Sequence, residues 1–100
     1  MRFNMYTIYD SCAQVYQRPF AAQSDGEAMR EFGDIANGND HPISRHPEHY
    51  SIWRIGTFSG SDGELGYETK ECLAHAIDLL QDKPQQDLLS AVPDNYGQSV

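Results

Sequence analysis

The chain has 100 residues, of which 39% are hydrophobic, 15 are acidic and 7 are basic, so its formal net charge at pH 7 is −8. This length predicts one small domain with a modest core, because such a chain buries roughly 60–70% of the surface that it exposes when unfolded. The negative charge argues against a protein that binds nucleic acid or an anionic membrane mainly by neutralising phosphates, since that mode of binding needs a basic surface.

The N-terminal segment is predicted to form a β-hairpin. Large apolar residues occupy both alternating sets within residues 3–9, which indicates a strand that is covered on two faces. Residues 10–11 (Asp-Ser) predict a turn, and residues 14–22 are predicted to form the returning strand. Pro19 has no N–H to donate, so this second strand is expected to lie at the edge of the sheet or to end near that residue.

An amphipathic helix of about three turns is predicted next. Ser24 and Glu27 form a capping box, in which the serine accepts from the N–H of Glu27 and the glutamate reaches back to the N–H of Ser24. Apolar residues recur at helical spacing from there to Ala36, and Phe32 is expected to dock on the sheet. Residues 37–38 (Asn-Gly) predict a left-handed stop.

Residues 50–67 are predicted to form a second hairpin around which the domain is organised. The segment holds the only tryptophan, Trp53, and its turn is expected within residues 59–63, where glycine, serine and aspartate cluster. The two faces of its first strand carry Tyr50, Ile52, Arg54 and Phe58 on one side and Trp53, Ile55 and Thr57 on the other. Both faces are apolar, so we expect this strand in the middle of the sheet, with helices on one side and a partner or ligand on the other.

A second helix is predicted over residues 70–81, with Thr69 as its N-cap. Its apolar stripe would consist of Leu73, Ile77 and Leu80. The order of elements is then β-β-α-β-β-α. This predicts an α+β fold with a four-stranded, mostly antiparallel sheet and two helices on one face. Residues 1–83 are expected to form a single domain, and residues 84–100 a flexible C-terminal tail.

The histidines and cysteines are not expected to form a metal or cofactor site. His41, His46 and His49 lie close together in sequence, but their spacing matches no familiar zinc motif, so we expect local capping and hydrogen bonding from them. Cys12 and Cys72 have no CxxC spacing and are expected to be reduced thiols in an intracellular protein. No apolar run approaches the roughly 20 residues that span a membrane, so no membrane partner is expected.

The sequence predicts a protein that is not an enzyme. It contains no nucleophile elbow, no GxGxxG and no phosphate-binding Gly-Lys motif. The carboxylates fall on the outer face of the first helix and in the turn of the second hairpin, where solvated charge is the simplest interpretation. No catalytic residue is therefore assigned.

The strand-borne aromatic rings and arginines form the candidate binding site. Its residues are Tyr6, Tyr16, Arg18, Phe20, Tyr50, Trp53 and Arg54. Aromatic rings interleaved with guanidinium groups are typical of proteins that bind single-stranded nucleic acid by base stacking along a cationic groove. The alternative is that the rings form the core and a homodimer interface, with the arginines at the edges. The residues alone leave both interpretations open.

Several motifs together carry a family resemblance. They are YTIYD at residues 6–10, RPF at 18–20, SDGEAMREF at 24–32 and HPEHYSIWRIGTFSGSDGEL at 46–65. Over about residues 5–66 the chain resembles the small non-structural protein of gokushoviruses and related microviruses, which are single-stranded DNA phages. The matching positions are Ala28, Arg30, Phe32, Pro47, Glu48, Tyr50, Ile52, Trp53, Ile55, Gly56 and Phe58. Ser59 departs from the pattern, because the family usually has an acidic residue there.

The resemblance implies a phage protein that is made in the cytoplasm of the infected host cell and is not part of the virion. Such proteins are usually described as DNA-binding or as tied to phage DNA synthesis. Two functions are therefore expected. The first is modulation of phage genome replication by weak binding of single-stranded DNA or a nucleotide on the aromatic sheet face. The second is a homodimeric interaction module that binds a host or phage protein, as a regulator or an inhibitor of host defence.

Overall fold

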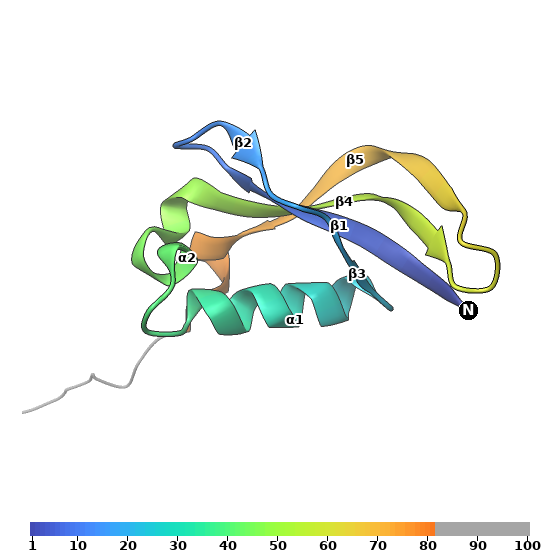
Figure 1. Ribbon diagram of the computed structural model, residues 1–100. Helices are drawn as coiled ribbons and strands as arrows, with labels where there is room; N and C mark the ends of the chain where they lie inside the picture. The colour runs from blue at the N-terminus through green and yellow to red at the C-terminus, as the bar shows by residue number, and fades with distance from the viewer. Residues whose placement is uncertain (82–100) are drawn as a thin grey trace, which may run out of the picture.

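The computed structural model describes residues 1–81 and places an antiparallel sheet against one main helix (Figure 1). The strands are β1 (Arg2–Asp10), β2 (Val15–Tyr16), β3 (Phe20–Ala22), β4 (Tyr50–Ser59) and β5 (Leu65–His75). The helical segments are α1 (Asp25–Ala36), α2 (Pro42–Arg45) and the 3₁₀ turns η1 (Pro47–His49) and η2 (Ala76–Leu79). The predicted α+β class and antiparallel sheet are confirmed. The predicted tail over residues 84–100 lies outside the described residues.

The two predicted hairpins form the sheet, in the strand order β2-β1-β4-β5, with β3 also paired to β1. β4 lies between β1 and β5, so its predicted place in the middle of the sheet is confirmed. The predicted returning strand of the first hairpin is two short pieces, β2 and β3, which border β1 in succession. Pro19 falls between them, as expected of a residue that cannot donate to a β-ladder.

The prediction of a second helix over residues 70–81 is wrong. Residues 65–75 form β5, which pairs with β4 through most of its length, and only residues 76–79 turn as a 3₁₀ segment. The helical spacing of Leu73 with two later apolar residues is a weak local signal. The hydrogen bonds between β4 and β5 outweigh this helical preference, because without β5 the backbone groups along one edge of β4 would have no partners. Residues 1–81 therefore form five strands and one main helix in place of the predicted four strands and two helices.

The predicted start of α1 is confirmed, and its end differs in detail. The Ser24 hydroxyl accepts from the Glu27 N–H at 3.1 Å, whereas the Glu27 carboxylate accepts from the N–H of Gln23, at 2.8 Å, and not from that of Ser24. The end is not left-handed, because Asn37 has φ −88°. Its side chain instead donates to the carbonyl of Leu79 at 2.9 Å, which ties the helix end to η2.

The hydrophobic core lies between α1 and one face of the sheet (Figure 1). Its largest fully buried side chains are Tyr6, Phe32, Ile43 and Ile52. Phe32 is 1% exposed, which confirms its predicted docking on the sheet. No helix within residues 1–81 has the length and apolar character needed to cross a membrane.

Two glycines allow the strands of the second hairpin to approach closely. A Cβ atom on Gly56 would overlap the carbonyl oxygen of Gly66 in β5, and a Cβ atom on Gly66 would meet the Thr57 hydroxyl. The turn itself lies within residues 60–64, and Gly63 adopts φ +77°, as the cluster of turn residues predicts. Glycine is therefore required at position 56 because the backbone of Gly66 leaves no room for a Cβ atom. At position 63 it is favoured because the backbone has a positive φ angle.

Candidate functional site

The sheet has two faces with different surroundings, and the predicted site residues are divided between them. Tyr6 pairs with Arg54, and Ile8 with Ile52, so these side chains share the face that packs on α1. Thr7 pairs with Trp53 on the opposite face, which we call the open face. The structure thus does not bring the seven predicted residues together into one surface.

Each predicted residue can be placed from its pairing and burial. Tyr6, Phe20, Tyr50 and Arg54 lie on the helix side, where Tyr6 and Tyr50 are 0% and 8% exposed. Tyr16 and Trp53 lie on the open face. Arg18 is exposed on the segment that joins β2 to β3. Only two of the five predicted rings are therefore available for stacking on the open face.

Four side chains form a cluster on the open face: Tyr9, Tyr16, Trp53 and Lys70. The rings of Tyr9 and Tyr16 are 4.5 Å apart, and those of Tyr16 and Trp53 meet edge to face at 6.5 Å. The Lys70 ammonium lies over both Tyr16 and Trp53, at 5.1 and 5.5 Å from the ring centroids. The cluster thus combines three aromatic rings with one cation.

Hydrogen bonding holds the base of the open face in place. The Trp53 indole N–H donates to the Ser51 hydroxyl at 2.9 Å, and the Thr7 hydroxyl donates to the Gln17 carbonyl at 2.6 Å. Thr7 and Ser51 are each 4% exposed, because the larger side chains lie over them. Since the indole N–H is already occupied, Trp53 can engage a ligand through its ring surface rather than through hydrogen bonds.

Two neighbouring hollows lie next to the open-face cluster, on the side toward the turn between β4 and β5. One, of about 570 Å³, is lined by Trp53, Ile55, Tyr67, Glu68, Thr69 and Lys70. The other, of about 330 Å³, is lined by Met5, Pro19, Ile55, Gly56, Thr57, Leu65, Gly66 and Tyr67. They share Ile55 and Tyr67, so the apolar surface is continuous from Trp53 to the end of the hairpin.

Tyr9 and Lys70 belong to this cluster and were missed by the sequence analysis. Lys70 was assigned to a helix, and its neighbourhood with Trp53 depends on the pairing of β5 with β4. Tyr9 could have been found, because it alternates with Tyr6 and Ile8 within β1 and so must lie on the other face.

Arg54 is engaged in ion pairs on the helix side and is not a free cation. Its guanidinium contacts the carboxylates of Asp25, Glu68 at 3.5 Å and Glu71 at 2.6 Å. The Asp25 carboxylate, followed by those of Glu71 and Glu68, raises the pKa of Arg54. A guanidinium that already contacts three carboxylates would have to give up some of these contacts to bind a nucleic-acid phosphate.

The Tyr6 hydroxyl completes this network by donating to Asp25 at 2.7 Å. Burial, together with that hydrogen bond, raises the pKa of Tyr6 from 10.0 to about 12. The pKa is raised because the folded protein stabilises the protonated phenol. The resulting contribution to the free energy of unfolding is fully present below about pH 10 and is lost as the pH rises through about 12.

Replacing Tyr6 by phenylalanine is expected to test this contribution. At pH 7 the variant should lose about 1–3 kcal/mol of unfolding free energy, because a hydrogen bond to a charged acceptor is removed. The difference between the two proteins should shrink as the pH rises from about 10 to 12, since only the wild type has this phenol to ionise. Urea denaturation at a series of pH values measures it, and a constant difference would contradict the assignment.

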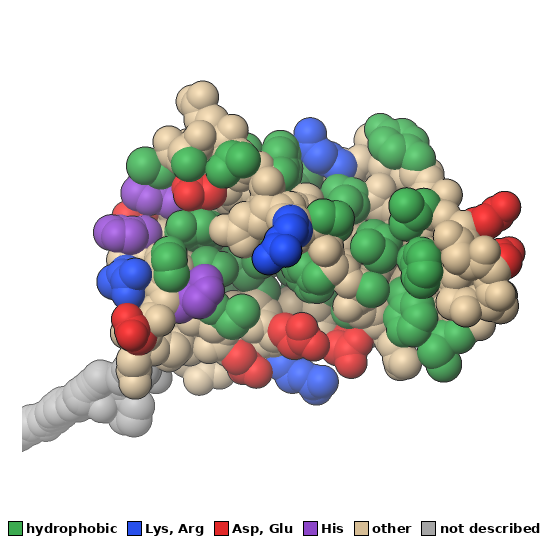
Figure 2. Space-filling view, in the orientation of Figure 1, with side chains coloured by type: hydrophobic (Ala, Val, Ile, Leu, Met, Phe, Trp, Pro, Cys, Tyr) green, Lys and Arg blue, Asp and Glu red, His purple; other side chains and the backbone are tan. Residues whose placement is uncertain are grey.

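The charges of the described residues are unevenly distributed. Figure 2 shows acidic side chains along α1 and at the tip of the second hairpin, with hydrophobic side chains spread over the sheet between them. Within residues 1–81, Arg2, Arg18, Arg30 and Lys70 form no ion pair, whereas Arg45 and Arg54 are paired with carboxylates. Of the four unpaired cations, Lys70 lies on the open face against Tyr16 and Trp53, and Arg18 lies on the exposed segment that follows Tyr16.

The thiol of Cys72 is close to a histidine but does not form a reactive pair. Cys72 Sγ lies 3.9 Å from the His75 Nε2 atom, and burial raises the pKa of the thiol. A cysteine nucleophile needs the opposite shift, toward the thiolate. Both cysteines are free in the structure.

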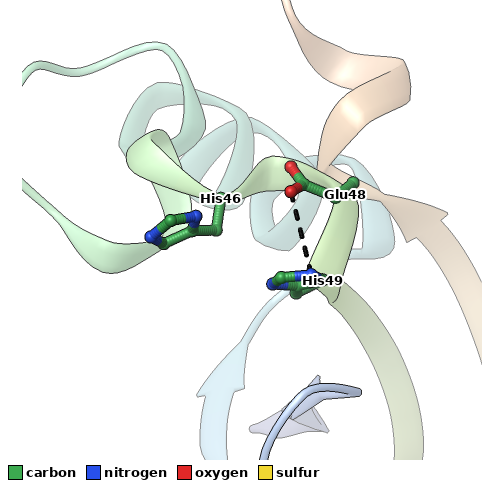
Figure 3. Close-up of side chains that lie close together, drawn as sticks. All are labelled: His46, Glu48 and His49. Carbon is green, nitrogen blue, oxygen red and sulfur yellow. Dashed lines mark ion pairs between the residues drawn. The ribbon is translucent and has the colours of Figure 1, made fainter.

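The three histidines of the loop before β4 have two different environments: His41 caps a helix, whereas His46 and His49 lie beside Glu48. His41 caps α2, with its Nδ1 atom accepting from the Ile43 N–H at 3.1 Å, as expected of a local hydrogen bond. His46 and His49 instead lie together with Glu48 at the η1 turn (Figure 3). Their rings are stacked, with centroids 5.8 Å apart.

Comparison with known proteins gives one family. The model of the Phage ORF5 protein family matches residues 3–79, which include all the strands and helices described above except the first residue of β1. No curated protein and no solved structure matches the chain.

Proposed function

This chain belongs to the Phage ORF5 protein family, and we propose on that premise that it is a non-enzymatic accessory protein of phage infection whose open sheet face binds single-stranded DNA or a nucleotide weakly. In this proposal the protein acts in the host cytoplasm and modulates replication of the phage genome. The motif resemblance to the small non-structural protein of gokushoviruses and related microviruses supports it, because those phages have single-stranded genomes that must be handled during replication.

The observation that carries the proposal is the placement of Lys70 over the rings of Tyr16 and Trp53. Stacking on aromatic rings and contact of a nearby cation with phosphate are the two interactions that bind single strands without sequence preference. Tyr9 continues the row of rings beyond Tyr16, and the hollow beside Trp53 adds apolar surface on the other side. The surface therefore offers successive bases a continuous track.

The same geometry predicts weak binding with a shallow salt dependence. Lys70 lies on the open face and Arg18 on the exposed segment after Tyr16, in a chain whose net charge is −8, so we expect at most two phosphates to be neutralised. For single strands the logarithm of the binding constant falls with that of the salt concentration with a slope of about −0.7 for each phosphate neutralised. Two phosphates would give a slope of about −1.4, or a roughly sevenfold loss of affinity between about 50 and 200 mM salt.

Fluorescence anisotropy of a labelled single-stranded oligonucleotide tests the proposal. We expect micromolar binding with that salt dependence, and a further loss in Lys70→Gln but not in the matched control Arg30→Gln on the exposed side of α1. Duplex DNA should bind less well, because its stacked bases cannot reach the rings. Absence of binding at low salt would contradict the proposal.

A second candidate function is a homodimeric module that docks on a host or phage protein. The observation in its favour is the exposed apolar surface at the start of β5, where Leu65 and Tyr67 are 73% and 88% exposed beside the second hollow. Exposed apolar patches of this kind often mark protein interfaces. Light scattering decides between the two, because a dimer mass together with absent DNA binding would favour this function.

A further inference from the structure

We propose that His46, Glu48 and His49 form a binding site for a divalent transition-metal ion, with Zn²⁺ as the ion that their chemistry fits best. Each residue offers one ligand atom, and all three atoms lie within 4.8 Å of one another. Figure 3 shows the three side chains projecting from the same short turn. The spacing of the histidines matches no familiar motif, so the sequence by itself predicts no metal here.

The backbone that carries the three ligands is held at both ends. The His46 N–H donates to the Pro42 carbonyl at 2.9 Å, and the His49 N–H donates to the His46 carbonyl at 3.0 Å. The His49 carbonyl in turn accepts from the N–H of Ser11, at 2.8 Å, which ties η1 to the turn after β1. Hydrogen bonds therefore hold the backbone on both sides of the proposed site.

The ligand types select a borderline transition metal. Two imidazoles and one carboxylate form the His₂Glu set that holds zinc in several enzymes, where water or another donor takes the fourth position. Calcium and magnesium prefer oxygen ligands, so they should bind poorly to two imidazoles. Zinc–nitrogen bonds are about 2.0–2.1 Å long, so the donor atoms must draw somewhat closer than they now lie.

The local charges favour a cation at this turn. The Glu48 carboxylate lies 3.7 Å from the His49 Nε2 atom, and the two side chains are 56% and 36% exposed, so an ion can reach them. Arg45, which directly precedes His46, is paired with Asp40 at 2.9 Å, so its positive charge is matched locally. The site thus offers one exposed carboxylate, which pairs with no Lys or Arg among the described residues, and two accessible imidazoles.

Calorimetric titration of the full chain, prepared without a polyhistidine tag, tests the proposal with ZnCl₂ and MgCl₂ as the probes. We expect one Zn²⁺ per chain with micromolar affinity and no measurable heat with MgCl₂. His46→Ala and His49→Ala should each weaken zinc binding at least tenfold, and Glu48→Gln should weaken it less. Zinc should raise the melting temperature of the wild type but not that of the His46→Ala, His49→Ala double variant.

Two controls keep the result specific. His75→Ala removes an exposed histidine that lies outside the site, beside Cys72, and should leave zinc binding unchanged. Cys12→Ser should also leave it unchanged. Circular dichroism of each variant shows whether it is folded. The proposal is overturned if the wild type binds no zinc, if the double variant binds it as tightly, or if His75→Ala or Cys12→Ser abolishes binding.

Discussion

Replacing Gly56 by alanine is expected to destabilise the protein by about 3 kcal/mol, the upper end of the range for an overpacked interior. The new Cβ atom would overlap the carbonyl oxygen of Gly66, which belongs to the backbone of β5 and cannot turn aside as a side chain can. β5 must therefore move away from β4 and lose hydrogen bonds near Thr57. Urea denaturation followed by circular dichroism measures the loss.

Gly33 supplies a matched control for the same chemical change. It lies inside α1, where an added Cβ atom would meet Leu79 Cβ at 3.7 Å, an ordinary packing distance. Alanine is favoured over glycine in a helix by up to about 1 kcal/mol, so Gly33→Ala should leave stability unchanged or raise it. Equal effects of the two substitutions would contradict the close approach of β4 and β5.

Replacing Trp53 by alanine is expected to separate binding from folding. Loss of the ring should weaken single-stranded DNA binding by about 1–3 kcal/mol, which is roughly 5- to 150-fold, because one base loses its stacking partner. The cost to stability should be only about 2 kcal/mol, since the ring lies on the open face and gives up one aromatic contact, one cation–π contact and the hydrogen bond to Ser51. Anisotropy and urea denaturation on the same preparation measure both quantities.

Phe32→Ala provides the reference for a ring in the core. Its side chain is 1% exposed between α1 and the sheet, so its loss should cost about 3–5 kcal/mol of stability. If Trp53→Ala unfolded the protein as readily as Phe32→Ala, the assignment of Trp53 to an open face would be wrong. If Trp53→Ala kept full DNA binding, the open-face cluster would not be the binding surface.

Elements with strong local signals were predicted well from the sequence. The capping residues before α1 and the glycine-rich turn between β4 and β5 act within a few residues of each other, so their effect can be read without knowledge of the fold. Phe32 was placed in the core by the same local periodicity. The split of the first returning strand could also be anticipated from Pro19, whose missing N–H interrupts a ladder.

The error at β5 had a specific cause. Leu73, near the end of β5, stands at helical spacing from Ile77 and Leu80, which follow the strand. The pairing of β4 with β5 also contains irregularities of register near Trp53 and Gly56 that blur the alternation expected of a β-strand. Lys70 moved from a helix to the sheet as a result, and the open-face cluster gained its cation. A single misassigned element therefore concealed the most informative side chain of the candidate site.

By itself the sequence determined the fold class, the first helix, both hairpins and a set of aromatic residues carried on strands, because these depend on local propensity and periodicity. Only the tertiary structure decided which rings share a face. Strand pairing assigns Tyr6 to the helix side and Trp53 to the open face, and it sends Arg54 into a network with Asp25. The η1 turn, by contrast, brings His46, Glu48 and His49 together locally. The physical reason is that a side chain's neighbours across a sheet are set by register, and register is fixed by the packing of the whole domain.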